Sequence, residues 1–282
     1  MVTGRALGFS VLAPFIGMAA GAWGWPAVFT GGALIMLVPL ALVLRVREDP
    51  AARSTNTFQW SAFRAFNSRL VLLFSLFGII SALVIMALPP FLNLYLTGSK
   101  PPYLGMDLRV AGWAFFVMGL GRIAGAVAAG RMTDRLGIQR SAWFCLVMTC
   151  AACFGLAAVT GLGMGSVARP ASVFAAPVVA LIFFGILLCA GYSYYDTIYF
   201  CGAMRLAEPA IYASMYAIFM AIGNIGAALG IPIAGAISGA PGLGFPAAAL
   251  AIGIIGLANV PLLPRVFGAL PAKKQTERVP VG

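Results

Sequence analysis

Eight apolar runs, each long enough to cross a membrane, divide this sequence and constrain its fold more than any other feature. A helix rises about 1.5 Å per residue, so about 20 apolar residues span the ~30 Å hydrocarbon core of a bilayer. Because 62% of the 282 residues are hydrophobic and only 9% are charged, we predict an all-α, polytopic membrane helical bundle with eight spans. The spans cover roughly residues 6–22, 26–45, 69–96, 109–130, 140–161, 173–201, 211–238 and 245–266.

The loops between these spans predict the orientation of the chain. Eight spans place both termini on one face, and fourteen Lys and Arg residues then fall on that face against three on the other. By the positive-inside rule the basic face is cytoplasmic. We therefore expect an integral membrane protein, in the inner (plasma) membrane of a bacterium, with both termini in the cytoplasm.

Composition also excludes several classes of function. The net charge of +11 comes from short basic clusters between spans rather than from one basic domain, so we expect contacts with membrane lipid and none with nucleic acid. All five cysteines lie in predicted spans, where small apolar packing is their simplest role. Cys150 and Cys153 have the spacing of a metal or redox pair, but the chain has no histidine. We predict no metal site, no cofactor and no enzymatic activity.

A charged turn at residues 130–140, GRMTDRLGIQR, interrupts two of the most apolar regions. Asp134 can accept hydrogen bonds from exposed amides at a neighbouring helix N-terminus, and the arginines can bridge carboxylates, helix C-termini or lipid headgroups. The alternative is a positive-inside loop in which the acid only balances an arginine.

This turn resembles the loop between the second and third helices of each six-helix half in the major facilitator superfamily, Gly-x-x-x-Asp-Arg/Lys-x-Gly followed by basic residues. The matching residues are Gly130, Asp134, Arg135, Gly137 and Arg140. Two weaker likenesses agree with it, at residues 13–17 (a fifth-helix motif of drug antiporters) and 24–29 (the entry to helix six). Residues 199–226 loosely resemble the muropeptide permease and acetyl-CoA transporter branch.

The resemblance implies a domain organisation. Residues 1–45 correspond to the last two helices of the N-terminal half, 46–68 to a cytoplasmic linker between halves, 69–267 to a six-helix C-terminal half and 268–282 to a cytoplasmic tail. A standard member has twelve helices, so the chain is expected to lack the first four, either as a fragment or as a naturally short protein. Possible partners are then those missing N-terminal helices or a second chain.

The resemblance also implies a function: secondary active transport of a small-molecule substrate by alternating access, with proton coupling, as symport or antiport. In this geometry Asp134 is expected to latch the two halves by meeting the N-terminus of the first span near Gly4 and Arg5. The alternative from another class is a non-transporting membrane scaffold or assembly factor with the same fold, which is favoured if Arg122 and Asp196 face lipid or another subunit.

Charged groups inside spans are costly and point to function. Arg122 and Asp196 each lie nine residues from a loop arginine, so we place them at similar depth facing one polar cavity, with Asp196 as a proton site. Arg122 binds an anion or takes part in coupling in this interpretation; snorkelling or pairing is its alternative. Tyr195, with Tyr192, Tyr194 and Tyr199, either faces the cavity or belongs to an interfacial belt.

Two asparagines complete the predicted substrate and coupling residues. Asn93 follows Pro89 and Pro90, a pair that should break the third span and free carbonyls toward protein or a cavity. Asn224 lies on the seventh span, where a hydrogen bond between helices is the alternative role. Glycines within the spans, such as Gly226 and Gly230, predict close helix packing.

Overall fold

The computed structural model describes residues 2–45, 60–98, 103–163, 175–207 and 211–270, and of residues 2–14, 61, 162 and 163 the backbone alone. These ranges are mostly helical and contain no β-strand. Seven helical segments are long and apolar enough to cross a membrane. These observations confirm the predicted all-α polytopic bundle.

The helices follow the predicted spans closely. In chain order they are α1 (Val2–Arg45), η2 (Trp60–Asn67), α2 (Arg69–Ala87), α3 (Pro89–Thr97), α4 (Leu108–Leu136), α5 (Ile138–Ala158), η3 (Val159–Gly163), α6 (Ala176–Leu206), α7 (Tyr212–Gly239), α8 (Gly244–Leu257) and α9 (Leu262–Phe267).

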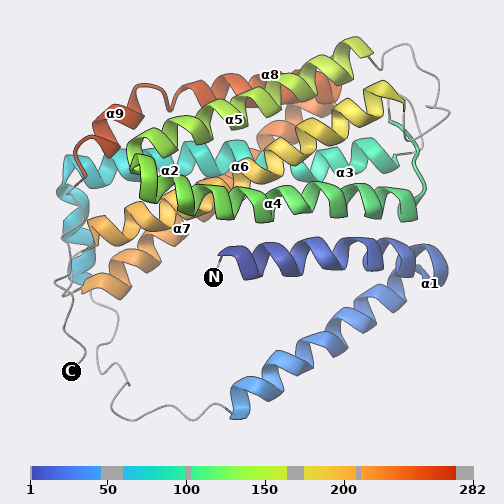
Figure 1. Cartoon of the computed structure of the whole chain (residues 1–282), viewed down its shortest axis with the longest axis horizontal. Coiled ribbons are helices and arrows are strands. Elements are labelled where there is room, and N and C mark those ends of the chain that lie inside the picture. The colour runs from blue at the N-terminus through green and yellow to red at the C-terminus, as the bar shows by residue number, and fades with distance from the viewer. Residues whose placement is uncertain (1, 46–59, 99–102, 164–174, 208–210, 271–282) are drawn as a thin grey trace.

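Helix α1 is bent into two limbs, which correspond to the first two predicted spans. Gly24 has φ 78° and ψ 171°, in the region that favours glycine, and breaks the helix there. In Figure 1 the first limb lies along the bundle, and the second turns back and diverges from it. Every residue from 32 to 45 is exposed, so the second limb presents apolar side chains on all sides.

The third predicted span is broken at its proline pair, as expected. Pro89 and Pro90 have no N–H to donate to the preceding turn, so α2 ends at Ala87 and α3 begins at Pro89. Leu88 keeps helical dihedral angles (φ −85°, ψ −32°), and its carbonyl accepts a bond from the Leu92 amide at 2.9 Å. The chain therefore continues in nearly the same direction through α3.

Successive membrane-spanning segments alternate in direction, with α2 and α3 as one segment, so their ends gather at two ends of the bundle (Figure 1). The end that holds α9 also holds the start of α2 and the turn between α4 and α5; we call it the α9 end. The opposite end holds the bend of α1, the end of α3 and the start of α4; we call it the Gly24 end. The charged turn, which we predicted to be cytoplasmic, therefore lies at the α9 end.

Glycines bring the helices together where the sequence predicted close packing. A Cβ on Gly226 or Gly230 of α7 would overlap the backbone carbonyls of Ile79 and Leu83 on α2. On α4, a Cβ on Gly125 would overlap the carbonyl of Ala190 on α6 in the same way. Backbones this close leave no room for side chains between them, which fixes the register of each helix pair.

Tyrosine hydroxyls of α6 hold the centre of the bundle. Tyr195 donates to the Gly78 carbonyl at 3.0 Å and Tyr199 donates to the Phe219 carbonyl at 2.7 Å. All four predicted tyrosines of this helix are buried. They therefore pack inside the protein and do not form an interfacial belt.

Candidate solute-binding cavity

A cavity of about 550 Å³ lies between the first limb of α1 and the helices α3, α4 and α6. Its walls are mostly apolar, with Pro89 and Pro90 on one side and Phe115 on another. The broken span therefore borders a cavity, as its free carbonyls require. A volume of this size matches the ~300–1,000 Å³ typical of small-molecule sites.

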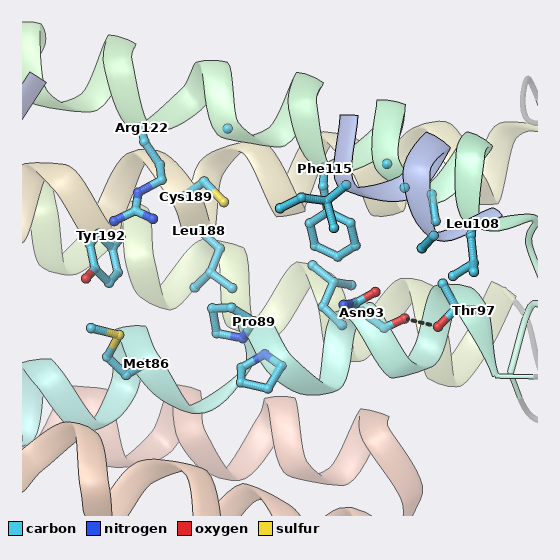
Figure 2. A pocket seen from close by; sticks show the side chains of 18 of the residues that line it. Met86, Pro89, Asn93, Thr97, Leu108, Phe115, Arg122, Leu188, Cys189 and Tyr192 are labelled. Atoms are coloured by element: carbon cyan, nitrogen blue, oxygen red, sulfur yellow. Dashed lines mark hydrogen bonds between the residues drawn. The ribbon is translucent and has the colours of Figure 1, made fainter. Parts of the chain in front are cut away.

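Arg122 stands at one end of this cavity, against Tyr192 (Figure 2). Its guanidinium carbon lies 3.8 Å from the centre of the Tyr192 ring, a cation–π contact between α4 and α6. Arg122 is only 8% exposed, so its side chain points into the bundle and does not snorkel to the membrane surface. The glycine contact of Gly121 with Ile186, one residue away, brings the two helices close enough for this pairing.

Asn93 and Thr97 lie toward the other end of the cavity, on α3 (Figure 2). The Thr97 hydroxyl donates to the Asn93 backbone carbonyl at 3.0 Å. The Asn93 side chain has one acceptor and two donor hydrogens. Asn93 therefore lies on the cavity wall, and its place on a solute pathway stays a prediction.

The other three predicted residues lie elsewhere. Asp196, Tyr195 and Asn224 are not among the described residues that line this cavity. Asp196 is buried one helical turn beyond Tyr192, and Asn224 is exposed on α7. Tyr195 lines a separate, much smaller cavity between α2, α5 and α6.

The register of α4 against α6 explains the position of Asp196. These helices run parallel, with Gly121 against Ile186 and Gly125 against Ala190. Continuing this register places Asp196 level with residue 131, nine residues beyond Arg122, or about 13 Å along the axis. The two residues therefore do not lie at the same depth, because α6 extends further than α4 toward the α9 end.

Cys189 is a cavity residue that the sequence did not predict, and Tyr192 was predicted only as one of four tyrosines that could face a cavity. Both lie on α6, the helix that Gly121 and Gly125 of α4 approach. The glycine spacing of α4 predicted a closely packed partner helix, but it did not identify α6 as that partner.

The charged turn lies at the α9 end, where Gly137 joins α4 to α5 with φ 83° and ψ 160°. Thr133 and Ser141 share a hydrogen bond of 3.0 Å across the turn, and Ser141 shares another of 2.8 Å with the Tyr194 hydroxyl. This buried chain fixes the turn, while the side chains of Asp134, Arg135 and Arg140 are exposed and Gly130 has open space around it. The latch partners Gly4 and Arg5 lie outside the described side chains, so the latch stays a prediction.

Comparison with protein families gives one match. The profile of the Major Facilitator Superfamily matches residues 80–281, which include the charged turn and all of α4 to α9. The chain therefore belongs to the major facilitator superfamily, a family of membrane transporters. Comparison with curated proteins and with solved structures gives no match.

Proposed function

We propose that this chain is a proton-coupled secondary transporter that moves a small solute by alternating access. The observation that carries the proposal is a buried arginine, Arg122, stacked on Tyr192 in the wall of a solute-sized cavity within the spans. A charge inside a membrane is energetically costly, and a position on a cavity wall allows that charge to bind a solute. Family membership supplies the class of activity.

The contact between α1 and α4 is the part of the structure that alternating access has to open. Gly17 packs so tightly that a Cβ there would lie 2.6 Å from the Leu108 carbonyl and 3.3 Å from the Gly112 Cα. Leu108 and Gly17 both line the cavity at its Gly24 end. By the resemblance, α1 and α4 belong to different halves of the transporter, so rocking of the halves separates this contact.

Asp196 is the proposed proton site, in α6 one turn from the cavity residue Tyr192. Tyr195, Tyr216 and Cys145 lie within electrostatic range of its carboxylate. Protonation of Asp196 removes a negative charge from inside the bundle. Because Asp196 and the cavity residue Tyr192 are one turn apart on α6, this change of charge occurs next to the cavity wall. The scaffold alternative is not favoured, since Arg122 and Asp196 are each only 8% exposed and do not face lipid.

The test is transport by the full chain in proteoliposomes that contain an impermeant pH dye. A panel of solutes is added outside, including a muropeptide and acetyl-CoA because residues 199–226 resemble that branch. We expect one or more solutes to drive proton flux in the wild type, and Asp196→Asn to abolish that flux. Asp107→Asn is the matched control, since Asp107 is an exposed carboxylate that caps α4 through the Arg109 amide at 2.8 Å.

Two results contradict this proposal. If Asp196→Asn retains full solute uptake, Asp196 is not the proton site. The absence of flux with every solute of the panel, in liposomes where the protein is folded and correctly inserted, argues against transport by this chain.

A further inference from the structure

The cavity is long, which restricts the shape of its ligand. Helix α4 contributes lining residues from Leu108 to Arg122, fourteen residues apart, or about 21 Å along the helix. The volume of about 550 Å³ extends along that length, so a single extended chain can occupy the cavity from end to end.

The charges of the lining restrict the ligand further. Among the described residues that line the cavity, Arg122 is the only charged one, so the wall favours one negative group and offers no carboxylate to a cation. The guanidinium carbon lies 3.8 Å from the centre of the Tyr192 ring, and the guanidinium carries its N–H donors in a fixed planar fork. This fork matches the two oxygens of a carboxylate or of another oxyanion.

The middle of the cavity requires an apolar body. Between the Arg122 end and the Asn93 end, the wall is formed by side chains such as Pro89, Phe115 and Leu188 (Figure 2). A sugar or polyol would lose hydrogen bonds to water there without replacement, at a cost for each hydroxyl group. An alkyl or aryl body instead gains about 25 cal/mol for each Å² it buries.

From these three observations we infer that the solute is an elongated, amphipathic organic monoanion. Its anionic head binds Arg122, and its apolar body extends along α4 toward Leu108. The Asn93 amide can bind a neutral polar group at the far end of the solute, as a donor and as an acceptor. This inference rests on the proposed function, because it names the class of solute that the transporter moves.

The test is direct binding to the full chain in nanodiscs of zwitterionic phosphatidylcholine, with empty nanodiscs as the blank for partitioning. The probes are straight-chain carboxylates from six to sixteen carbons, with the alcohol and the amine of equal length, and alkyl sulfonates and phosphates. Trp25 lines the cavity, so its fluorescence serves as the readout of binding. Loss of the signal in Trp25→Phe assigns that signal to Trp25. We expect affinity for carboxylates to rise about fourfold per methylene until the cavity is full, and then to stop rising.

Arg122→Gln tests the head group. We expect it to weaken carboxylate binding by roughly 10- to 150-fold, the range for hydrogen bonds to a charged group, and to leave alcohol binding within about twofold. Arg109→Gln is the matched control, because Arg109 is on the same helix but is exposed and not on the cavity wall. Phe115→Trp narrows the middle of the cavity and should shorten the preferred chain without changing the preference for an anion, so it tests the shape even if Arg122→Gln fails to fold.

Three results overturn the inference. Equal binding of carboxylate, alcohol and amine shows that Arg122 does not select the head group. A preferred chain length that Phe115→Trp leaves unchanged shows that the chain does not lie along α4. Complete loss of carboxylate binding in nanodiscs that contain anionic phospholipid shows that the cavity holds a bilayer lipid and not a dissolved solute.

The same solutes in the proteoliposome assay separate this inference from the proposed function. Carboxylates that bind but drive no flux support the solute class and refute transport. Flux of a polar or cationic solute, with carboxylates that neither bind nor move, supports transport and refutes the solute class.

Discussion

Replacement of Gly121 by alanine should destabilise the contact between α4 and α6. The added Cβ would lie 2.5 Å from the Ile186 carbonyl oxygen, and an ordinary contact of carbon with a carbonyl oxygen is about 3.4 Å. The helices must therefore separate by about 0.9 Å, and a gap of that size forfeits about a quarter to a half of the dispersion energy across it. Overpacking of this kind costs about 1–3 kcal/mol.

Gly130→Ala is the matched control, because Gly130 is on the same helix and a Cβ there meets no atom within 4 Å. Both variants gain roughly 0.5–1 kcal/mol from replacing a helical glycine, so their difference isolates the packing cost. At about 2–4 °C per kcal/mol, we expect Gly121→Ala to melt roughly 2–12 °C below Gly130→Ala.

The assay is thermal unfolding in detergent, followed with a dye that fluoresces on reacting with thiols. The buried cysteines Cys145, Cys150 and Cys153 are the native reporters, since they become accessible only when the bundle opens. Gly121→Ala should also weaken carboxylate binding, because Arg122 is the next residue. An unfolding temperature for Gly121→Ala equal to or above that of Gly130→Ala would refute the packing argument.

Three further substitutions test the bonds and backbone described above. Tyr199→Phe leaves the Phe219 carbonyl without the 2.7 Å bond it accepts in the bundle, and should cost about 1–3 kcal/mol in the same unfolding assay; an unchanged unfolding temperature contradicts it. Gly137→Ala should cost about 1–2 kcal/mol because φ is 83° there, whereas an unfolding temperature equal to or above that of Gly130→Ala would show that the turn relaxes. If the latch exists, Asp134→Asn should lower proton-coupled flux about two- to fivefold at an unchanged unfolding temperature, while Asp107→Asn has no effect; equal flux in both variants argues against the latch.

Most of the fold could be predicted because its determinants are local. The length and hydropathy of each run decide whether it can span a bilayer, without reference to any other run. The bend at Gly24 and the break before Pro89 follow from backbone properties of single residues. The glycine pairs predicted close packing, and Gly226 and Gly230 do meet the backbone of α2.

The site could be predicted only in part, because it depends on pairs of helices. Counting residues from each loop placed Arg122 and Asp196 at equal depth, but α4 and α6 have different lengths beyond their contact. Their register is set by the meeting of Gly125 with Ala190, which leaves Tyr192 and not Asp196 on the cavity wall beside Arg122. No pattern within one helix contains that register.

The sequence by itself therefore determined the class of this protein: the spans, their breaks and the charged turn that marks the superfamily. All of these are properties of short segments, which hydropathy and backbone restriction define. Only the tertiary structure decided that Arg122 lies against Tyr192, that Asn93 and Arg122 share one cavity, and that Asp196 lies nearer the α9 end than Arg122. The physical reason is that glycine contacts between helices fix rotation and register together, and these contacts join residues that are far apart in the chain.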